Sequence, residues 1–112
     1  MPFIEVKTTE DLSAVAAELK SALGAAITAI PGKSESWLMV NLVGEQKMYF
    51  QGSDAPCALF SVSIFGTATD NAYDDLTCRL CAIAQQYLQV PPERTYVRYR
   101  EVDHWGYNNF NF

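Results

Sequence analysis

The spacing of apolar side chains predicts two long amphipathic helices. Apolar residues that recur about every 3.6 positions share one helix face. In the first helix these are Leu12, Val15, Ala16, Leu19, Leu23, Ala26, Ile27 and Ile30. A second helix is predicted from about Asp70 to Val90, with an apolar face of Ala72, Leu76, Leu80, Ile83, Ala84, Tyr87 and Val90. Pro31-Gly32 and Pro91-Pro92 stop the helices, and the polar residues 8–11 are expected to cap the first one.

Four other apolar segments predict β-strands. They are Phe3–Lys7, Trp37–Val43, Cys57–Phe65 and Thr95–Val102. The second is nearly continuous in apolar residues, which favours a buried strand. It is followed by a predicted turn at residues 44–46 and a short edge segment at Met48–Phe50.

The order of these elements repeats strand, helix and strand in each half of the chain. Each half is a βαβ unit, whose right-handed crossover gives a parallel strand pair. Together the units predict an α+β fold in which a four-stranded mixed sheet carries both helices on one face, with residues 1–112 forming a single domain. The other sheet face has no cover left within the chain, so we expect another copy of the chain to cover it.

The composition places the chain among globular proteins. Of 112 residues, 49% are hydrophobic and 19% charged, which suits a chain with an apolar core. The net charge of -5 argues against nucleic-acid and anionic-membrane partners, because both need clustered Lys and Arg. No segment reads as a signal peptide or a membrane span. A cytoplasmic protein is expected, although secretion without a signal peptide is the alternative.

Three cysteines suggest neither a disulfide framework nor a metal site. Their number is odd, and a chain of this length can build a core without disulfides. Cys78 and Cys81 form a CxxC pair inside the second predicted helix, away from the helix N-terminus that would activate a thiol. Cys57 and His104 are the only further soft ligands and lie far along the chain. No metal or cofactor is expected.

Pro2 carries the clearest candidate chemistry. Removal of Met1 would leave its nitrogen as a free secondary amine at the start of an apolar strand. A free α-amine has a pKa of about 7.7 to 8.0, and burial or a nearby cation lowers that pKa. A neutral amine near pH 7 can act as a general base. While Met1 is attached, the nitrogen is an amide and cannot do so.

Five segments carry a family resemblance over essentially the whole chain. They are Met1-Pro2-Phe3, Gly32-Lys33, Pro56-Cys57-Ala58-Leu59, Pro92-Glu93-Arg94-Thr95-Tyr96 and Gly106-Tyr107-Asn108-Asn109-Phe110. In this order they resemble the family of macrophage migration inhibitory factor and D-dopachrome tautomerase, in the tautomerase superfamily. The resemblance implies a homotrimer with a central barrel and active sites between subunits. It also implies keto–enol tautomerisation of an α-keto acid such as phenylpyruvate, with Pro2 as the catalytic acid and base.

The resemblance also implies substrate-binding residues. Lys33 matches an active-site lysine that would hold the substrate carboxylate; otherwise it is a solvated loop lysine. Ile64 is the position whose backbone would lie near the substrate, although Phe65 aligns with the usual isoleucine of the family. Phe65 would then form either an aromatic wall or part of the core.

Three further positions concern the rest of the pocket. Tyr96 matches a tyrosine that a neighbouring subunit contributes; the alternative is a buried strand tyrosine. Arg98 replaces an asparagine of the mammalian members and could bind a second carboxylate, which suggests a diacid substrate, or it is an exposed strand arginine. Tyr107 replaces a tryptophan and keeps the aromatic rim.

Two other functions compete with tautomerisation. One is a cytokine-like signalling protein with a retained pocket and an unknown receptor. The other is hydration or dehalogenation of an unsaturated acid, as in sister families with the same proline. That chemistry needs a protonated Pro2 and a group that activates water, and no residue clearly supplies the second.

Overall fold

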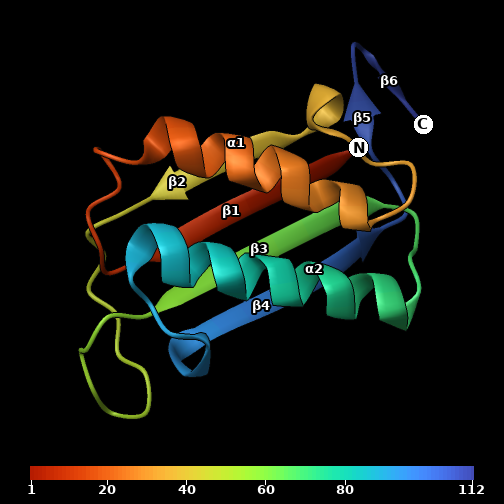
Figure 1. Ribbon diagram of the computed structural model, residues 1–112. Coiled ribbons are helices and arrows are strands. Elements are labelled where there is room, and N and C mark those ends of the chain that lie inside the picture. Colours follow the sequence, from red (N-terminus) through yellow and green to blue (C-terminus); the bar gives the residue numbers. More distant parts are fainter.

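A four-stranded mixed sheet forms one layer of the computed structural model, which describes residues 1–112, and two helices lie across one face of it (Figure 1). The strands are β1 (Pro2–Thr8), β2 (Met39–Val43), β3 (Ala58–Phe65) and β4 (Thr95–Val102). Their order is β2-β1-β3-β4. β1 pairs in parallel with β2, and β3 with β4, while β1 and β3 are antiparallel. The predicted pair of parallel units within a mixed sheet is confirmed.

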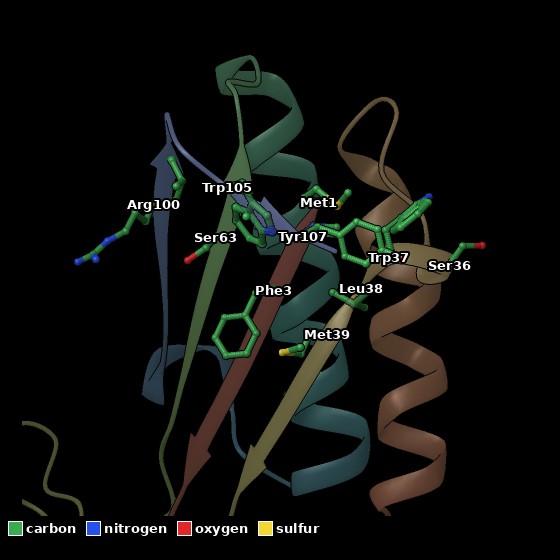
Figure 2. Close-up of a pocket in the computed structure, with 13 residues that line it drawn as sticks. Met1, Phe3, Ser36, Trp37, Leu38, Met39, Ser63, Arg100, Trp105 and Tyr107 are labelled. Carbon is green, nitrogen blue, oxygen red and sulfur yellow. The ribbon is translucent and has the colours of Figure 1, made fainter. Parts of the chain in front are cut away.

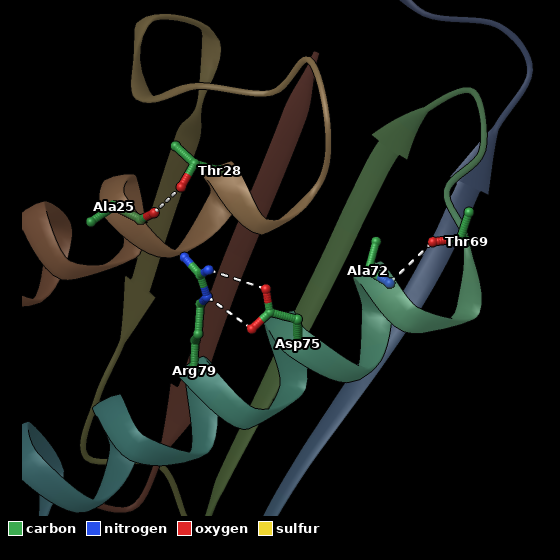
Figure 3. Close-up of polar contacts among 6 residues, drawn as sticks. All are labelled: Ala25, Thr28, Thr69, Ala72, Asp75 and Arg79. Carbon is green, nitrogen blue, oxygen red and sulfur yellow. Dashed lines mark hydrogen bonds and ion pairs between the residues drawn. The ribbon is translucent and has the colours of Figure 1, made fainter.

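Both predicted helices exist, but both are shorter than the apolar pattern suggests. They are α1 (Ala16–Ala26), which continues as the 3-10 turn η1 (Ile27–Ala29), and α2 (Asp70–Ile83), which continues as the π-helical turn η3 (Ala84–Leu88). α2 begins where predicted because the Thr69 hydroxyl accepts a hydrogen bond from the Ala72 amide at 3.2 Å (Figure 3). Such a cap stabilises a helix by about 1 kcal/mol.

The predicted cap of the first helix is wrong. α1 has no side-chain cap and begins after Val15. The hydroxyl of Thr8 instead donates to the Cys57 carbonyl at 2.8 Å, because Thr8 is the last residue of β1 and faces the start of β3. Asp11 closes a local turn by accepting from the Ser13 amide at 2.9 Å. These polar residues therefore join strands and turns and do not start the helix.

The prediction for the second strand needs two corrections. Trp37 belongs to the 3-10 turn η2 (Glu35–Trp37), and β2 is an edge strand, with Met39 68% exposed. The predicted edge segment at residues 48–50 is absent as a strand: Phe50 makes only an isolated bridge to Ser53. Gln51 and Gly52 between them have positive φ angles, so the chain turns back at once.

The core lies between the sheet and the helices and contains nineteen buried apolar residues. Strand alternation supplies the sheet side, where Ile4 and Phe60 are fully buried, and Leu19 and Leu76 supply the helix side. The opposite sheet face bears Glu5, Asn41, Ser61 and Arg98 and has no cover within the chain. No helix combines the length and apolarity that a membrane crossing requires.

The C-terminal segment forms a small hairpin beside the start of β1. After the turn η4 (Pro92–Arg94) and β4 come β5 (Gly106–Tyr107) and β6 (Phe110–Asn111), which pair antiparallel. Asn108 and Asn109 at the turn have φ angles of 51° and 76°, as a type I′ hairpin turn requires. Both chain ends therefore lie at the same end of the sheet (Figure 1).

Candidate active site

Pro2 lies at the end of the sheet where the two chain termini meet. It is the first residue of β1, it is buried, and it pairs in register with Ile64 of β3. The preceding Met1 is held by its carbonyl, which accepts a hydrogen bond from the Phe65 amide at 3.1 Å. The sheet therefore fixes the backbone on both sides of the bond whose cleavage would free the Pro2 nitrogen.

Lys33 lies beside this N-terminus. Gly32, with φ of +82°, allows the tight turn after η1, and the Lys33 amide donates to the Ile30 carbonyl at 3.1 Å. The Lys33 Nζ then donates to the Phe65 carbonyl at 3.1 Å. Burial and the Lys33 ammonium together lower the pKa of the Met1 α-amino group. An amine at this end of β1 is therefore biased toward its neutral form.

A cavity of about 630 Å³ opens at Pro2 (Figure 2). Of the residues predicted for the site, Pro2 and Tyr107 line it. The remaining lining residues are Met1, Phe3, Ser36, Trp37, Leu38, Met39, Ser63, Arg100, Val102, Trp105 and Gly106. The volume lies within the range of about 300 to 1,000 Å³ that small-molecule sites occupy.

One wall of the cavity is a row of side chains across the sheet that the sequence analysis missed. Phe3 pairs in register with Met39 on one side and Ser63 on the other, and Ser63 pairs with Arg100. Phe3 and Met39 lie next to each other in Figure 2, with Arg100 on the opposite side of the cavity from Trp37. Alternation along each predicted strand indicates which residues face away from the helices, but only the register brings these four into one row.

The opposite wall is aromatic. The rings of Trp37 and Tyr107 meet edge to face with centroids 5.3 Å apart, and Tyr107 stacks against Phe112 at 6.2 Å. Phe112 also packs 6.0 Å from Phe65. Phe65 therefore does not line the cavity itself but supports its aromatic rim through Phe112. Trp37, predicted as the start of a buried strand, is 52% exposed at this rim.

Of the other predicted residues, Ile64 neighbours Pro2 only through its strand backbone, and Tyr96 and Arg98 lie apart from Pro2 in the single chain. The Ile64 side chain is 1% exposed and packs in the core. Tyr96 pairs with Leu59, which faces Lys7 at the far end of β1. Arg98 is at mid-strand, where its Nη2 donates to the Ser61 hydroxyl at 3.0 Å. Within one chain, Lys33 is the only one of the predicted cations that lies beside the N-terminus.

The CxxC pair lies where the sequence predicts, inside α2. Cys78 is exposed and Cys81 is partly buried, and both are free thiols. Burial, with the neighbouring Cys78 as a second cause, raises the pKa of the Cys81 thiol. A raised pKa disfavours the thiolate, which is the reactive form.

Comparison with known proteins agrees with this geometry over the whole chain. The profile of the family described as macrophage migration inhibitory factor (MIF) matches residues 1–110. The macrophage migration inhibitory factor of Meriones unguiculatus is 32% identical over 117 residues, covering 100% of this chain and 99% of the relative. That of Mus musculus is 29% identical with the same coverage. The crystal structure of Leishmania major MIF2 matches with a TM-score of 0.93 at 31% identity, covering 100% of this chain and 97% of that one. The chain therefore belongs to the macrophage migration inhibitory factor family, within the tautomerase superfamily.

Proposed function

We propose that this protein, once Met1 is removed, is a keto–enol tautomerase of phenylpyruvate-type α-keto acids with Pro2 as its acid and base. The observation that supports this most directly is the setting of the N-terminus. Pro2 borders a cavity of about 630 Å³, and burial together with the Lys33 ammonium lowers the pKa of the α-amino group of Met1, the residue next to it. Family membership supports the same class of reaction.

The proposed mechanism moves one proton within the substrate. The neutral Pro2 nitrogen takes a proton from the carbon next to the ketone, and the C–H electron pair shifts to give an enolate. The resulting ammonium then donates that proton to the enolate oxygen, which yields the enol and restores the neutral amine. The reverse sequence converts enol to ketone. A general base of this kind contributes about 10² to 10⁴ in rate.

Substrate recognition in this proposal uses both ends of an aryl keto acid. The Lys33 ammonium would pair with the carboxylate. Its hydrogen bond to the Phe65 carbonyl supports this role because it holds the ammonium beside the N-terminus. The Trp37 and Tyr107 rings offer an apolar wall for an aryl group. Ile64 would contribute through its backbone, because its side chain is buried.

The proposal includes a homotrimer in which a neighbouring chain completes each site. The uncovered sheet face supports this, since Met39 and Tyr96 on it are 68% and 62% exposed. In one chain Tyr96 and Pro2 belong to opposite ends of the sheet. Tyr96, and with it Arg98, would therefore reach the Pro2 of an adjacent chain. Small-molecule keto acids and other copies of the chain are the proposed partners.

The decisive experiment measures ketonisation and enolisation of phenylpyruvate by ultraviolet absorbance, with protein whose mass confirms loss of Met1. The matched variant is Pro2→Gly, which keeps a free N-terminal amine but loses the secondary amine of the proline ring. We expect kcat/KM to fall by about 100-fold or more, since the positioned base supplies at least that factor. The same chain with Met1 retained should be inactive.

Two results would contradict the proposal. One is equal activity in the Pro2→Gly variant and the parent protein. The other is no turnover by correctly processed, folded protein. The second result would shift the assignment to a binding role or to a diacid substrate held by Lys33 and Arg98.

The names of the relatives support a second candidate function, in signalling. The proteins from Meriones unguiculatus and Mus musculus are called macrophage migration inhibitory factors. This chain would then inhibit the migration of macrophages through a receptor. A migration assay with parent protein and Pro2→Gly separates the candidates: equal inhibition by both would show that signalling does not need the tautomerase chemistry.

A further inference from the structure

The loop between β2 and β3 has little secondary structure of its own. Its tip is a tight turn in which the amides and carbonyls of Phe50 and Ser53 exchange hydrogen bonds of 2.9 and 3.0 Å. The two residues between them, Gln51 and Gly52, have φ angles of 52° and 76°, as in a type I′ turn. A loop of this length needs contacts from elsewhere to hold one conformation.

Arg94 supplies those contacts. From η4, directly before β4, its Nε donates to the Pro56 carbonyl at 2.9 Å and its Nη1 to the Phe50 carbonyl at 3.1 Å. Its Nη2 donates to the carbonyls of Ser53 and Ala55 at 3.1 and 2.9 Å. Arg94 forms no ion pair with a carboxylate. The fork of N–H donors on the guanidinium therefore binds the backbone of this one loop.

The loop in turn fixes an aromatic pair. The Arg94 guanidinium lies 5.2 Å from the centroid of the Phe50 ring, within the range of a cation–π contact. The Phe50 ring also packs edge to face against Tyr96, with centroids 4.8 Å apart and planes at 76°. Tyr96 remains 62% exposed. Phe50 therefore supports one side of a tyrosine whose other side is open.

We propose that Arg94 is a positioning residue for the active site of the adjacent chain. By tying residues 50–56 together it holds Phe50 behind Tyr96, so that the Tyr96 ring is already oriented when a neighbouring chain presents its Pro2. This inference rests on the proposed function, in which Tyr96 completes that site. Arg94 itself touches neither substrate nor Pro2. A pre-oriented ring binds substrate without first losing the freedom of the loop.

The first test is Arg94→Met, which keeps an unbranched side chain and removes every donor. KM for phenylpyruvate should rise about tenfold, well inside the ~100-fold that a misplacement of about 1 Å can cost. The midpoint of the pH profile should not move, because Pro2 and Lys33 are unchanged. Arg79→Met is the matched control. Arg79 is an arginine whose guanidinium is likewise held by hydrogen bonds, two of 3.1 Å to Asp75 (Figure 3), but it lies on the exposed side of α2.

A double-mutant cycle separates positioning from general destabilisation. If Arg94 acts through Tyr96, then Arg94→Met should have almost no further effect on KM in a Tyr96→Ala background. Phe50→Leu provides a second route for the case in which Arg94→Met folds poorly. This variant keeps the hydrogen bonds from Arg94 to the loop carbonyls but removes the aromatic support of Tyr96. It should raise KM when Tyr96 is present and leave KM unchanged in the Tyr96→Ala background.

The outcomes distinguish this inference from the proposed function. One outcome is an active parent protein in which the effect of Arg94→Met on KM simply adds to that of Tyr96→Ala, and the effect of Phe50→Leu does the same. That result would overturn the positioning role and leave the tautomerase function intact. So would a KM for Arg94→Met equal to that of Arg79→Met. A processed parent protein that neither turns over nor binds phenylpyruvate would overturn the proposed function, and the positioning role with it.

Discussion

At the scale of single residues, the proposed function gives Lys33 two roles, one in the pKa of the base and one in binding the substrate. Burial and the Lys33 ammonium lower the pKa of the Met1 α-amino group. In the proposed function the same ammonium lies beside the freed Pro2 amine and also holds the substrate carboxylate. The base must be neutral, so kcat/KM should rise with pH through the amine pKa, with a midpoint below the ordinary value of about 7.7 to 8.0. Loss of the cation removes one of the causes that keep this midpoint low.

Lys33→Met should therefore shift the midpoint of the pH profile upward and raise KM. The rise in KM should be roughly ten- to a hundredfold, since a charged hydrogen bond contributes about 1.5 to 3 kcal/mol. Initial rates of phenylpyruvate ketonisation across pH measure both effects. Lys47→Met, an exposed lysine of the β2–β3 loop, is the control. An unchanged midpoint with a raised KM would show that Lys33 binds substrate without tuning the base.

The same scale shows how far the sequence predicts the site. Pro2 is predicted because removal of Met1 would free its amine, and Tyr107 is predicted only because the C-terminal tail resembles that of the family. Phe3, Ser63 and Arg100 are missed because their proximity depends on the register of three strands. No local pattern encodes that register; it follows from strand order and from which faces pack against the helices.

At the scale of elements, periodicity succeeds where one face is buried by the chain itself. β3 alternates strictly between buried and partly exposed residues, and its predicted extent agrees to within one residue. The apolar pattern around Trp37 and Met39 wrongly predicts a buried strand. These side chains line an open cavity, and Met39 belongs to an edge strand. An apolar run signals contact with something apolar, and it does not say whether that partner belongs to the same chain.

Gly24 and Gly44 differ in how much room the structure leaves for a Cβ atom. The three atoms nearest to a Cβ on Gly24 in α1 would all belong to the Glu35 side chain. That side chain is half exposed and pairs loosely with Lys20 at 3.4 Å, so it can move aside. A Cβ on Gly44 would lie 2.7 Å from the backbone carbonyl of Glu10. The same carbonyl accepts from the Glu45 amide at 2.9 Å and cannot move freely.

The two alanine substitutions should therefore change stability in opposite directions. Gly24→Ala should stabilise by about 0.5 to 1 kcal/mol, because alanine favours a helix interior over glycine by about that amount. Gly44→Ala should destabilise by about 1 to 3 kcal/mol through overpacking. Urea unfolding followed by circular dichroism, at one protein concentration for all variants, measures both. Loss of stability in Gly24→Ala would mean that Glu35 is held more firmly than its exposure suggests.

At the scale of the whole molecule, one face of the sheet has no layer of the chain packed against it. It combines exposed apolar side chains with a network of polar ones, such as Asn41 bonded to Glu5 at 3.0 Å. Three copies around a closed axis would bury these faces against one another. Light scattering should then give about three times the 12.5 kDa chain mass.

The sharing of sites between chains gives the most specific prediction. Pro2→Gly and Tyr96→Ala remove groups that the proposed trimer brings together from different chains. If equal amounts of the two variants are unfolded and refolded together, random closed assembly should restore about one quarter of the sites, because a site needs one chain of each kind in the correct order. Measured kcat/KM should rise to about that fraction of the parent value. Separately refolded variants that are mixed afterwards are the control. If co-refolding gave heterotrimers by native mass spectrometry but no recovery of activity, Pro2 and Tyr96 would not serve the same site across chains.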